Sequence, residues 1–134
     1  MANIVLDSYA MLAFFRNEPG KEKVEQLLNE TAADKHNLFM SCINAGEVYY
    51  MASRKDGAQK AELVWKALQQ FPIEIIEGDL EFTFKAAQLK SKYKISFADA
   101  FAAALGISKK AVVYTGDKEF ENIINEQGFR FKYL

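Results

Sequence analysis

Short apolar runs alternate along the chain with longer stretches in which apolar residues recur every three or four positions. The runs predict strands at 4–6, 38–40, 73–76, 111–114 and 129–134. The longer stretches predict helices at 9–15, 24–28, 43–52, 61–71, 80–93, 97–107 and 117–126. Because strands and helices alternate, we expect a mostly parallel sheet of four or five strands with helices on both faces. The predicted fold is therefore a three-layer α/β/α sandwich.

The helix predicted over 80–93 carries more apolar positions than a single stripe needs. One row contains Leu80, Phe84 and Ala87, and a neighbouring row contains Phe82, Ala86, Leu89 and Tyr93. Two adjacent apolar rows predict a helix that is buried over a wide arc.

The composition fits one cytosolic domain spanning residues 1–134. Half of the 134 residues are hydrophobic, which is enough for a core, and no linker or repeat interrupts the chain. The first residues lack the features of a signal peptide, and no apolar run is long enough to span a membrane. Cys42 and His36 are the only residues of their types, which excludes an internal disulfide and a Cys/His zinc site. We expect Cys42 to be buried and His36 to lie in a solvated loop.

Charged residues are nearly missing from three segments, and the few that remain are acidic. Residues 1–15, 37–53 and 95–108 contain one charge each, namely Asp7, Glu47 and Asp99. At the overall share of 26%, those 46 positions would hold about 12 charges. A carboxylate among apolar residues is costly unless it is paired or binds a metal. Helix capping is an equal alternative for Asp7, but it explains Glu47 and Asp99 less well.

A fourth acid, Asp117, follows the strand predicted at 111–114, much as Asp7 follows the first strand. The carboxyl ends of parallel strands lie at one edge of a sheet, where open α/β folds bind their ligands. Glu47 and Asp99 reach the same edge if their helices begin there. Four acids without a neighbouring cation favour Mg²⁺ or Mn²⁺, one or two ions, and metal-assisted hydrolysis of a phosphodiester.

The segments around these acids resemble the PIN domain family, and most closely the VapC toxins of toxin–antitoxin pairs. The similar segments are residues 4–8, 41–48, 96–100 and 115–120, in the family's order over nearly the whole chain. The resemblance implies a Mg²⁺- or Mn²⁺-dependent ribonuclease with Asp7, Glu47, Asp99 and Asp117 as metal ligands. Ser8 and Thr115 would be supporting hydroxyls, with Thr115 orienting Asp117 or a metal-bound water. Asn44 would line the pocket, although an N-cap role is an equal alternative.

The resemblance also implies partners, namely an RNA substrate, a cognate antitoxin that blocks the active-site groove, and a second copy in a homodimer. Aromatic candidates for the groove or the dimer contact are Tyr9, Phe14, Phe15, Tyr49 and Tyr50. Core packing is the more common role for such phenylalanines. Candidates for phosphate contacts are Lys85, Lys90, Lys92, Lys94, Lys109 and Lys110, for which a solvated helix face is the more common explanation.

Three other functions remain open from the sequence. A stand-alone RNA-processing nuclease would use the same acids without an antitoxin. A response-regulator receiver and a haloacid-dehalogenase-type phosphatase both accept a phosphoryl group and also place acids at strand ends. The phosphatase, however, needs a second aspartate two positions after the first, where Tyr9 stands. A non-catalytic module of the same fold would have no need for four acids.

The net charge of −1 does not exclude RNA. Setting aside the four candidate metal ligands leaves 17 basic residues against 14 acidic ones. The remaining surface is therefore mildly basic, as a phosphate-binding protein requires.

Overall fold

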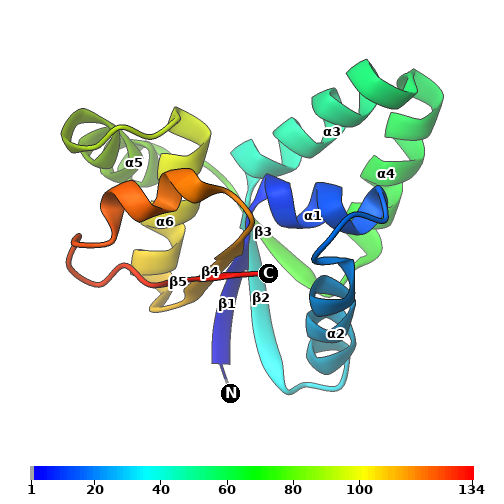
Figure 1. The fold of residues 1–134 in the computed structure, drawn as a ribbon, viewed down its shortest axis with the longest axis horizontal. Coiled ribbons are helices and arrows are strands. Elements are labelled where there is room, and N and C mark those ends of the chain that lie inside the picture. The colour runs from blue at the N-terminus through cyan, green and yellow to red at the C-terminus, as the bar shows by residue number, and fades with distance from the viewer. Residues whose placement is uncertain (1) are drawn as a thin grey trace.

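A five-stranded parallel sheet forms the centre of the molecule (Figure 1), and the computed structural model describes it over residues 2–134. The strands are β1 (Ala2–Leu6), β2 (His36–Ser41), β3 (Ile73–Ile76), β4 (Val112–Thr115) and β5 (Phe131–Tyr133). Their order across the sheet is β3-β2-β1-β4-β5, and each neighbouring pair is parallel. The sheet is thus wholly parallel, as the alternating pattern predicts.

Helices cover both faces of this sheet and bury two separate apolar clusters. Figure 1 shows α1 (Ser8–Phe15), α2 (Lys21–Ala32), α3 (Cys42–Asp56) and α4 (Ala58–Gln70) on one side, with α5 (Leu80–Lys92) and α6 (Phe97–Lys109) on the other. In β1, Ile4 and Leu6 join the first cluster and Val5 joins the second. This alternation follows from the two-residue period of a strand, and it confirms the three-layer fold.

Helix α6 packs very close to the sheet because its buried face is made of small residues. Ala100, Ala102, Ala103 and Ala104 are buried there, and a Cβ placed on Gly106 would lie 2.8 Å from Val113. Such a contact is too short for any side chain, so glycine is required at this crossing. Close packing of α6 fixes the position of Asp99 at its start relative to the strands.

The chain reverses its direction of travel across the sheet between β1 and β4. From β1 it builds outward through β2 to β3, and it then returns to place β4 on the other side of β1. Open α/β sheets bind ligands beside the carboxyl ends of the strands at such a switch point. Leu6 pairs with Tyr114 in the register, so the residues that follow β1 and β4 are neighbours at this edge.

Several local expectations are wrong in detail. The last strand covers only Phe131–Tyr133, and a 3₁₀-helix, η1 (Lys118–Ile123), replaces the helix predicted over 117–126. His36 begins β2 and bonds to Glu30 at 2.6 Å, so it is half-buried instead of lying in a solvated loop. Cys42 is only half-buried, with its sulfur accepting the Gly78 N–H.

Helix α5 is also less buried than its two apolar rows predict. Ala86 and Leu89 face the core, whereas Leu80 is 85% exposed and Phe84 is 62% exposed. The row formed by Leu80, Phe84 and Ala87, called the outer row of α5 below, therefore faces solvent. Among residues 2–134, no helix combines the length and apolar character needed to cross a membrane.

Candidate functional site

Asp7 lies at the carboxyl end of β1, where it caps α1. Its Oδ1 accepts the Ala10 N–H at 2.9 Å, and its Oδ2 accepts the Thr115 hydroxyl at 2.5 Å. Thr115 ends β4, so this bond joins the two strands on either side of the switch point. Asp7 is only 1% exposed and is therefore fixed in both position and direction.

Glu47 lies in the second turn of α3, where two side chains hold it by one oxygen. Its Oε1 accepts the Ser8 hydroxyl at 2.8 Å and the Asn44 amide at 3.1 Å. Asn44 is fully buried, accepts the Ser41 hydroxyl through Oδ1, and donates to the carbonyl of Ala98 in α6. The start of α3 is thereby tied to the start of α6, and Glu47 is brought to the edge that Asp7 occupies.

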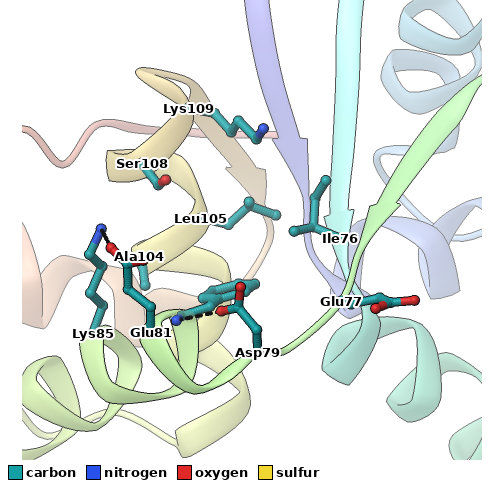
Figure 2. A pocket seen from close by; sticks show the side chains of 10 residues that line it. Ile76, Glu77, Asp79, Glu81, Lys85, Ala104, Leu105, Ser108 and Lys109 are labelled. Atoms are coloured by element: carbon teal, nitrogen blue, oxygen red, sulfur yellow. Dashed lines mark hydrogen bonds and ion pairs between the residues drawn. The ribbon is translucent and has the colours of Figure 1, made fainter.

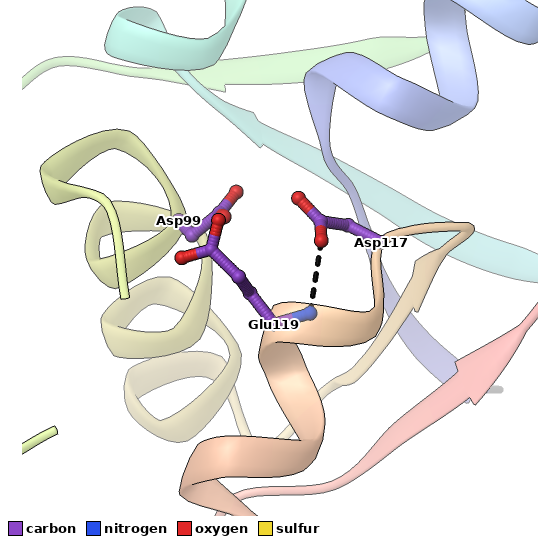
Figure 3. A group of neighbouring side chains, drawn as sticks. All are labelled: Asp99, Asp117 and Glu119. Atoms are coloured by element: carbon purple, nitrogen blue, oxygen red, sulfur yellow. Dashed lines mark hydrogen bonds between the residues drawn. The ribbon is translucent and has the colours of Figure 1, made fainter. Parts of the chain in front are cut away.

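Asp99, Asp117 and Glu119 form the tightest acidic group, and Figure 3 shows their carboxylates directed toward a common space. One oxygen from each residue lies within 4.8 Å of the others. Asp99 lies in the first turn of α6 and is 7% exposed. Asp117 caps η1 by accepting the Glu119 N–H at 2.9 Å, and Glu119 in turn accepts the Ser96 N–H at 2.9 Å. Two helix starts therefore hold three carboxylates around one space.

Burial makes two of these acids hard to ionise. It raises the pKa of Asp7 to about 7, and the charges of Asp117 and Glu47 add to the effect. It raises the pKa of Asp99 to about 8, with the charges of Asp117, Asp7 and Glu119 adding to it. The hydrogen bonds that Asp7 accepts from Thr115 and Ala10 act in the opposite direction but do not outweigh burial.

Among residues 2–134, none of these acids has a cationic side chain as its partner. The ion pairs within residues 2–134 are His36–Glu30, Lys85–Glu81 and Lys92–Glu126, all outside this site. Clustered carboxylates without a counter-ion repel one another, and a divalent cation relieves that repulsion. Their all-oxygen donor set matches the ligands of Mg²⁺ and Mn²⁺. The residues present therefore fit a hard divalent metal, although the ligand roles predicted for Asp7, Glu47, Asp99 and Asp117 stay a prediction.

Glu119 is a site residue that the charge pattern does not single out. It lies among Asp117, Lys118 and Glu121, so it does not stand out as an isolated charge in an apolar segment. A usable signal is its spacing, because a residue two positions after a capping aspartate remains in the same first turn. Its carboxylate therefore stays close to that of Asp117.

The supporting residues Ser8, Asn44 and Thr115 all form hydrogen bonds to acids of the site or to their backbone. The Thr115 hydroxyl donates to the Asp7 carboxylate. It also accepts the backbone N–H of Asp117 at 2.9 Å, but it forms no hydrogen bond with the Asp117 carboxylate. The N-cap of α3 is Ser41, so that alternative for Asn44 is wrong, and its side chain instead positions Glu47. Ser8 acts in the same way on Glu47 from the start of α1.

The aromatic candidates divide into buried and exposed residues. Phe14 and Phe15 both pack on Phe71, with ring centroids 5.7 and 5.8 Å from it, and these half-buried side chains pack against the core cluster. Tyr49 is half-buried against Trp65. Tyr9 and Tyr50 are 48% and 44% exposed, which leaves these two available to a partner or substrate.

Four of the lysines proposed for phosphate contacts are either paired with an acid or far from the acidic site. Lys85 and Lys92 are engaged by Glu81 and Glu126. Lys109 is the last residue of α6 and Lys110 follows it, and Lys109 lies about 15 Å along the helix from Asp99 at 1.5 Å per residue.

A separate pocket of about 180 Å³ lies between the end of β3, α5 and α6 (Figure 2). Its charged side chains include Lys85 and Glu81, which pair with each other at 3.4 Å, and Asp79, which caps α5. The acidic cluster consists of Asp7, Glu47, Asp99, Asp117 and Glu119, and none of these residues lines the pocket. The acidic cluster, and not this pocket, is the candidate active site.

Solved structures with this fold come from toxin–antitoxin systems. VapBC2 of Rickettsia felis matches with a TM-score of 0.76 at 17% identity, covering 98% of both chains. VapBC of Salmonella typhimurium matches with a TM-score of 0.76 at 20% identity, covering 99% of this chain and 98% of that one. VapC20 of Mycobacterium tuberculosis, described as a Sarcin-Ricin loop cleaving toxin, matches with a TM-score of 0.72 at 15% identity, covering 88% and 92%.

The family comparison agrees with the fold. No curated protein sequence matches the chain. The PIN domain family model matches residues 4–125, a stretch that contains every acid of the cluster. The chain therefore belongs to the PIN domain family.

Proposed function

We propose that this protein is a divalent-metal-dependent endoribonuclease, with residues 1–134 forming one nuclease domain. The observation that carries the proposal is the group of buried or half-buried carboxylates at the switch point, none of which pairs with a cationic side chain in the described part of the chain. Asp7, Asp99, Asp117 and Glu119 would hold one or two Mg²⁺ or Mn²⁺ ions, with Glu47 beside them. When bound, such ions activate a water and offset the negative charge of the scissile phosphate.

The protein's own groups serve to hold these carboxylates still. Thr115 and the Ala10 N–H fix both oxygens of Asp7, so it cannot rotate away when charge changes nearby. Ser8 and Asn44 hold Glu47 by a single oxygen. Because these carboxylates are already held in place, they need little reorganisation during the reaction. Such preorganisation is the main source of electrostatic catalysis.

The direct test is cleavage of a labelled single-stranded RNA by protein purified from a strain without its major ribonucleases. We expect cleavage with Mg²⁺ or Mn²⁺, none with EDTA, and recovery when excess metal is restored. Cleavage that persists unchanged in EDTA would contradict a metal-dependent mechanism. Binding of RNA without cleavage in either metal would favour a non-catalytic PIN module.

The same proposal includes an antitoxin that blocks the site. Its support is that the similar structures from Rickettsia felis and Salmonella typhimurium are described as VapBC2 and VapBC, and another similar structure is described as a toxin–antitoxin complex from Klebsiella pneumoniae. By blocking RNA cleavage, the antitoxin would prevent this protein from stopping translation. Co-expression with the product of an adjacent short reading frame should restore growth of cells that the protein alone arrests. A protein that is harmless when expressed alone would instead favour a stand-alone RNA-processing nuclease.

The outer row of α5 supports the homodimer. Leu80 and Phe84 are exposed apolar side chains one helical turn apart, and Glu81 and Lys85 beside them offer opposite charges to a two-fold related copy. We expect the L80E/F84E variant to be monomeric, as measured by light scattering during size-exclusion chromatography. The matched control is Leu63→Glu on α4, at a residue that is 64% exposed. A dimer that survives the double substitution would place the contact elsewhere.

A further inference from the structure

An open hollow of about 430 Å³ adjoins the acidic cluster on the side of α1 and α3. Its lining residues are Arg16, Glu47, Tyr50, Met51, Arg54 and Lys55, and we name it the arginine hollow. Glu47 belongs to both the hollow and the acidic site. A chain molecule with one unit at the acids therefore has its next units in reach of this hollow.

Three cations surround this space without acidic partners. Arg16, Arg54 and Lys55 form no ion pair with any residue of the described part of the chain. The only carboxylate in the lining is Glu47, and it is already held by Ser8 and Asn44. The hollow thus offers positive charge beside a site of negative charge, which favours a ligand that carries its own anionic groups.

Arg16 has hydrogen-bonding capacity that the protein does not use. Its Nη2 donates to the Met51 carbonyl at 3.3 Å, but its buried Nε finds no acceptor within residues 2–134. A buried donor without an acceptor is unfavourable, and an anionic oxygen that entered the hollow would correct it. Arginine presents several N–H groups in a plane, an arrangement suited to phosphate.

Tyr50 gives the hollow a flat aromatic surface. Tyr50 is 44% exposed, and the Arg54 guanidinium lies 5.1 Å from its ring centroid. Tyrosine rings and arginine guanidinium groups are surfaces on which unpaired bases stack. A base inside a duplex is already stacked on its neighbours and has no free face for this ring. The combination therefore favours a single-stranded nucleic acid over a duplex.

We infer that the arginine hollow binds the nucleotides next to the cleaved bond of a single-stranded RNA. Arg16, Arg54 and Lys55 bind phosphates, and Tyr50 stacks on a base. This inference rests on the proposed nuclease function for its substrate, and it adds the residues that position that substrate. An acidic polypeptide is the competing occupant, and it would use the cations without needing the ring.

The test measures binding of a fluorescent RNA of about ten nucleotides by anisotropy, in EDTA and at several salt concentrations. We expect R54Q/K55Q to bind about tenfold more weakly and to lower the log–log salt slope by one to two, about one for each phosphate that the variant no longer binds. We expect Tyr50→Leu to weaken binding about tenfold with the slope unchanged, since stacking releases no counter-ions. The control K60Q/K66Q removes the same charge from exposed positions on α4. Thermal melts confirm that each variant is folded.

Cleavage kinetics with metal present separate positioning from folding. The R54Q/K55Q and Y50L variants should raise KM and leave kcat within about twofold of wild type. The inference is overturned if both variants bind RNA with wild-type affinity and salt slope, or if K60Q/K66Q loses as much affinity as they do. Either result leaves the proposed nuclease function intact. Displacement of RNA by polyglutamate as readily as by polyuridine, with no effect of Y50L, would assign the hollow to an acidic polypeptide. RNA binding through these residues without any cleavage would refute the nuclease and leave the subsite standing.

Discussion

Asp99→Asn is expected to lower the rate of RNA cleavage by about a thousandfold or more at saturating metal. Asp99 is the buried member of the group whose oxygens lie within 4.8 Å of one another. Asparagine has nearly the same shape but no charge, so the space between Asp117 and Glu119 would attract a divalent cation far less. The measurement is single-turnover cleavage of labelled RNA over a range of Mg²⁺ and Mn²⁺ concentrations.

Asp79→Asn is the matched control for this substitution. Asp79 caps α5 by accepting the Phe82 N–H at 2.9 Å, yet it lies outside the acidic cluster. Asparagine caps helices about as well as aspartate, so we expect neither activity nor stability to change much. Cleavage by the Asp99→Asn protein at the wild-type rate would remove the acidic cluster from the mechanism. Its folded state is checked by a cooperative melt.

The convergence of Asp7 and Asp117 at one edge was predictable because it needs only parallel strands. Asp7 directly follows β1, Asp117 follows β4 after one intervening residue, and every parallel strand presents its carboxyl end to the same edge. The direct bond between Thr115 and Asp7 was not predictable, since it requires β4 to lie next to β1. Strand order depends on which helices cover which face, and that is decided by packing across the whole chain.

The outer row of α5 shows where a pattern alone is insufficient. Leu80 and Phe84 have the spacing of core residues, and nothing in the sequence separates a face that packs inside from one that meets a partner. Glu119 shows the opposite case, a site residue hidden among other charges. Its role depends on the 3₁₀ turn that follows Asp117 and on its bond to the Ser96 N–H, which lies 23 residues away in sequence. The spacing after Asp117 can suggest Glu119 as a candidate, but its bond to Ser96 is visible only in three dimensions.

The metal-free protein should lose stability as the pH rises from about 4 to 8. The folded-state pKa of Asp7 is about 7 and that of Asp99 about 8, whereas both have ordinary values of 3.8 when unfolded. Well below pH 4 both acids are protonated in either state. Above it the unfolded chain releases these protons first, so unfolding becomes more favourable until the folded pKa is passed. For Asp7 alone the difference corresponds to at most about 4 kcal/mol.

Urea denaturation in EDTA at pH 5 and pH 8 measures this effect, and we expect the free energy of unfolding to be lower at pH 8 by about 2 kcal/mol or more. Mg²⁺ or Mn²⁺ should reverse most of the loss, because a bound cation favours the ionised carboxylates that burial opposes. The Asp99→Asn protein should show a smaller loss and a weaker response to metal, since one of the two titrating acids is gone. Equal stability at both pH values would mean that water reaches these carboxylates freely. A response to metal that Asp99→Asn leaves unchanged would place the cation at another group of acids.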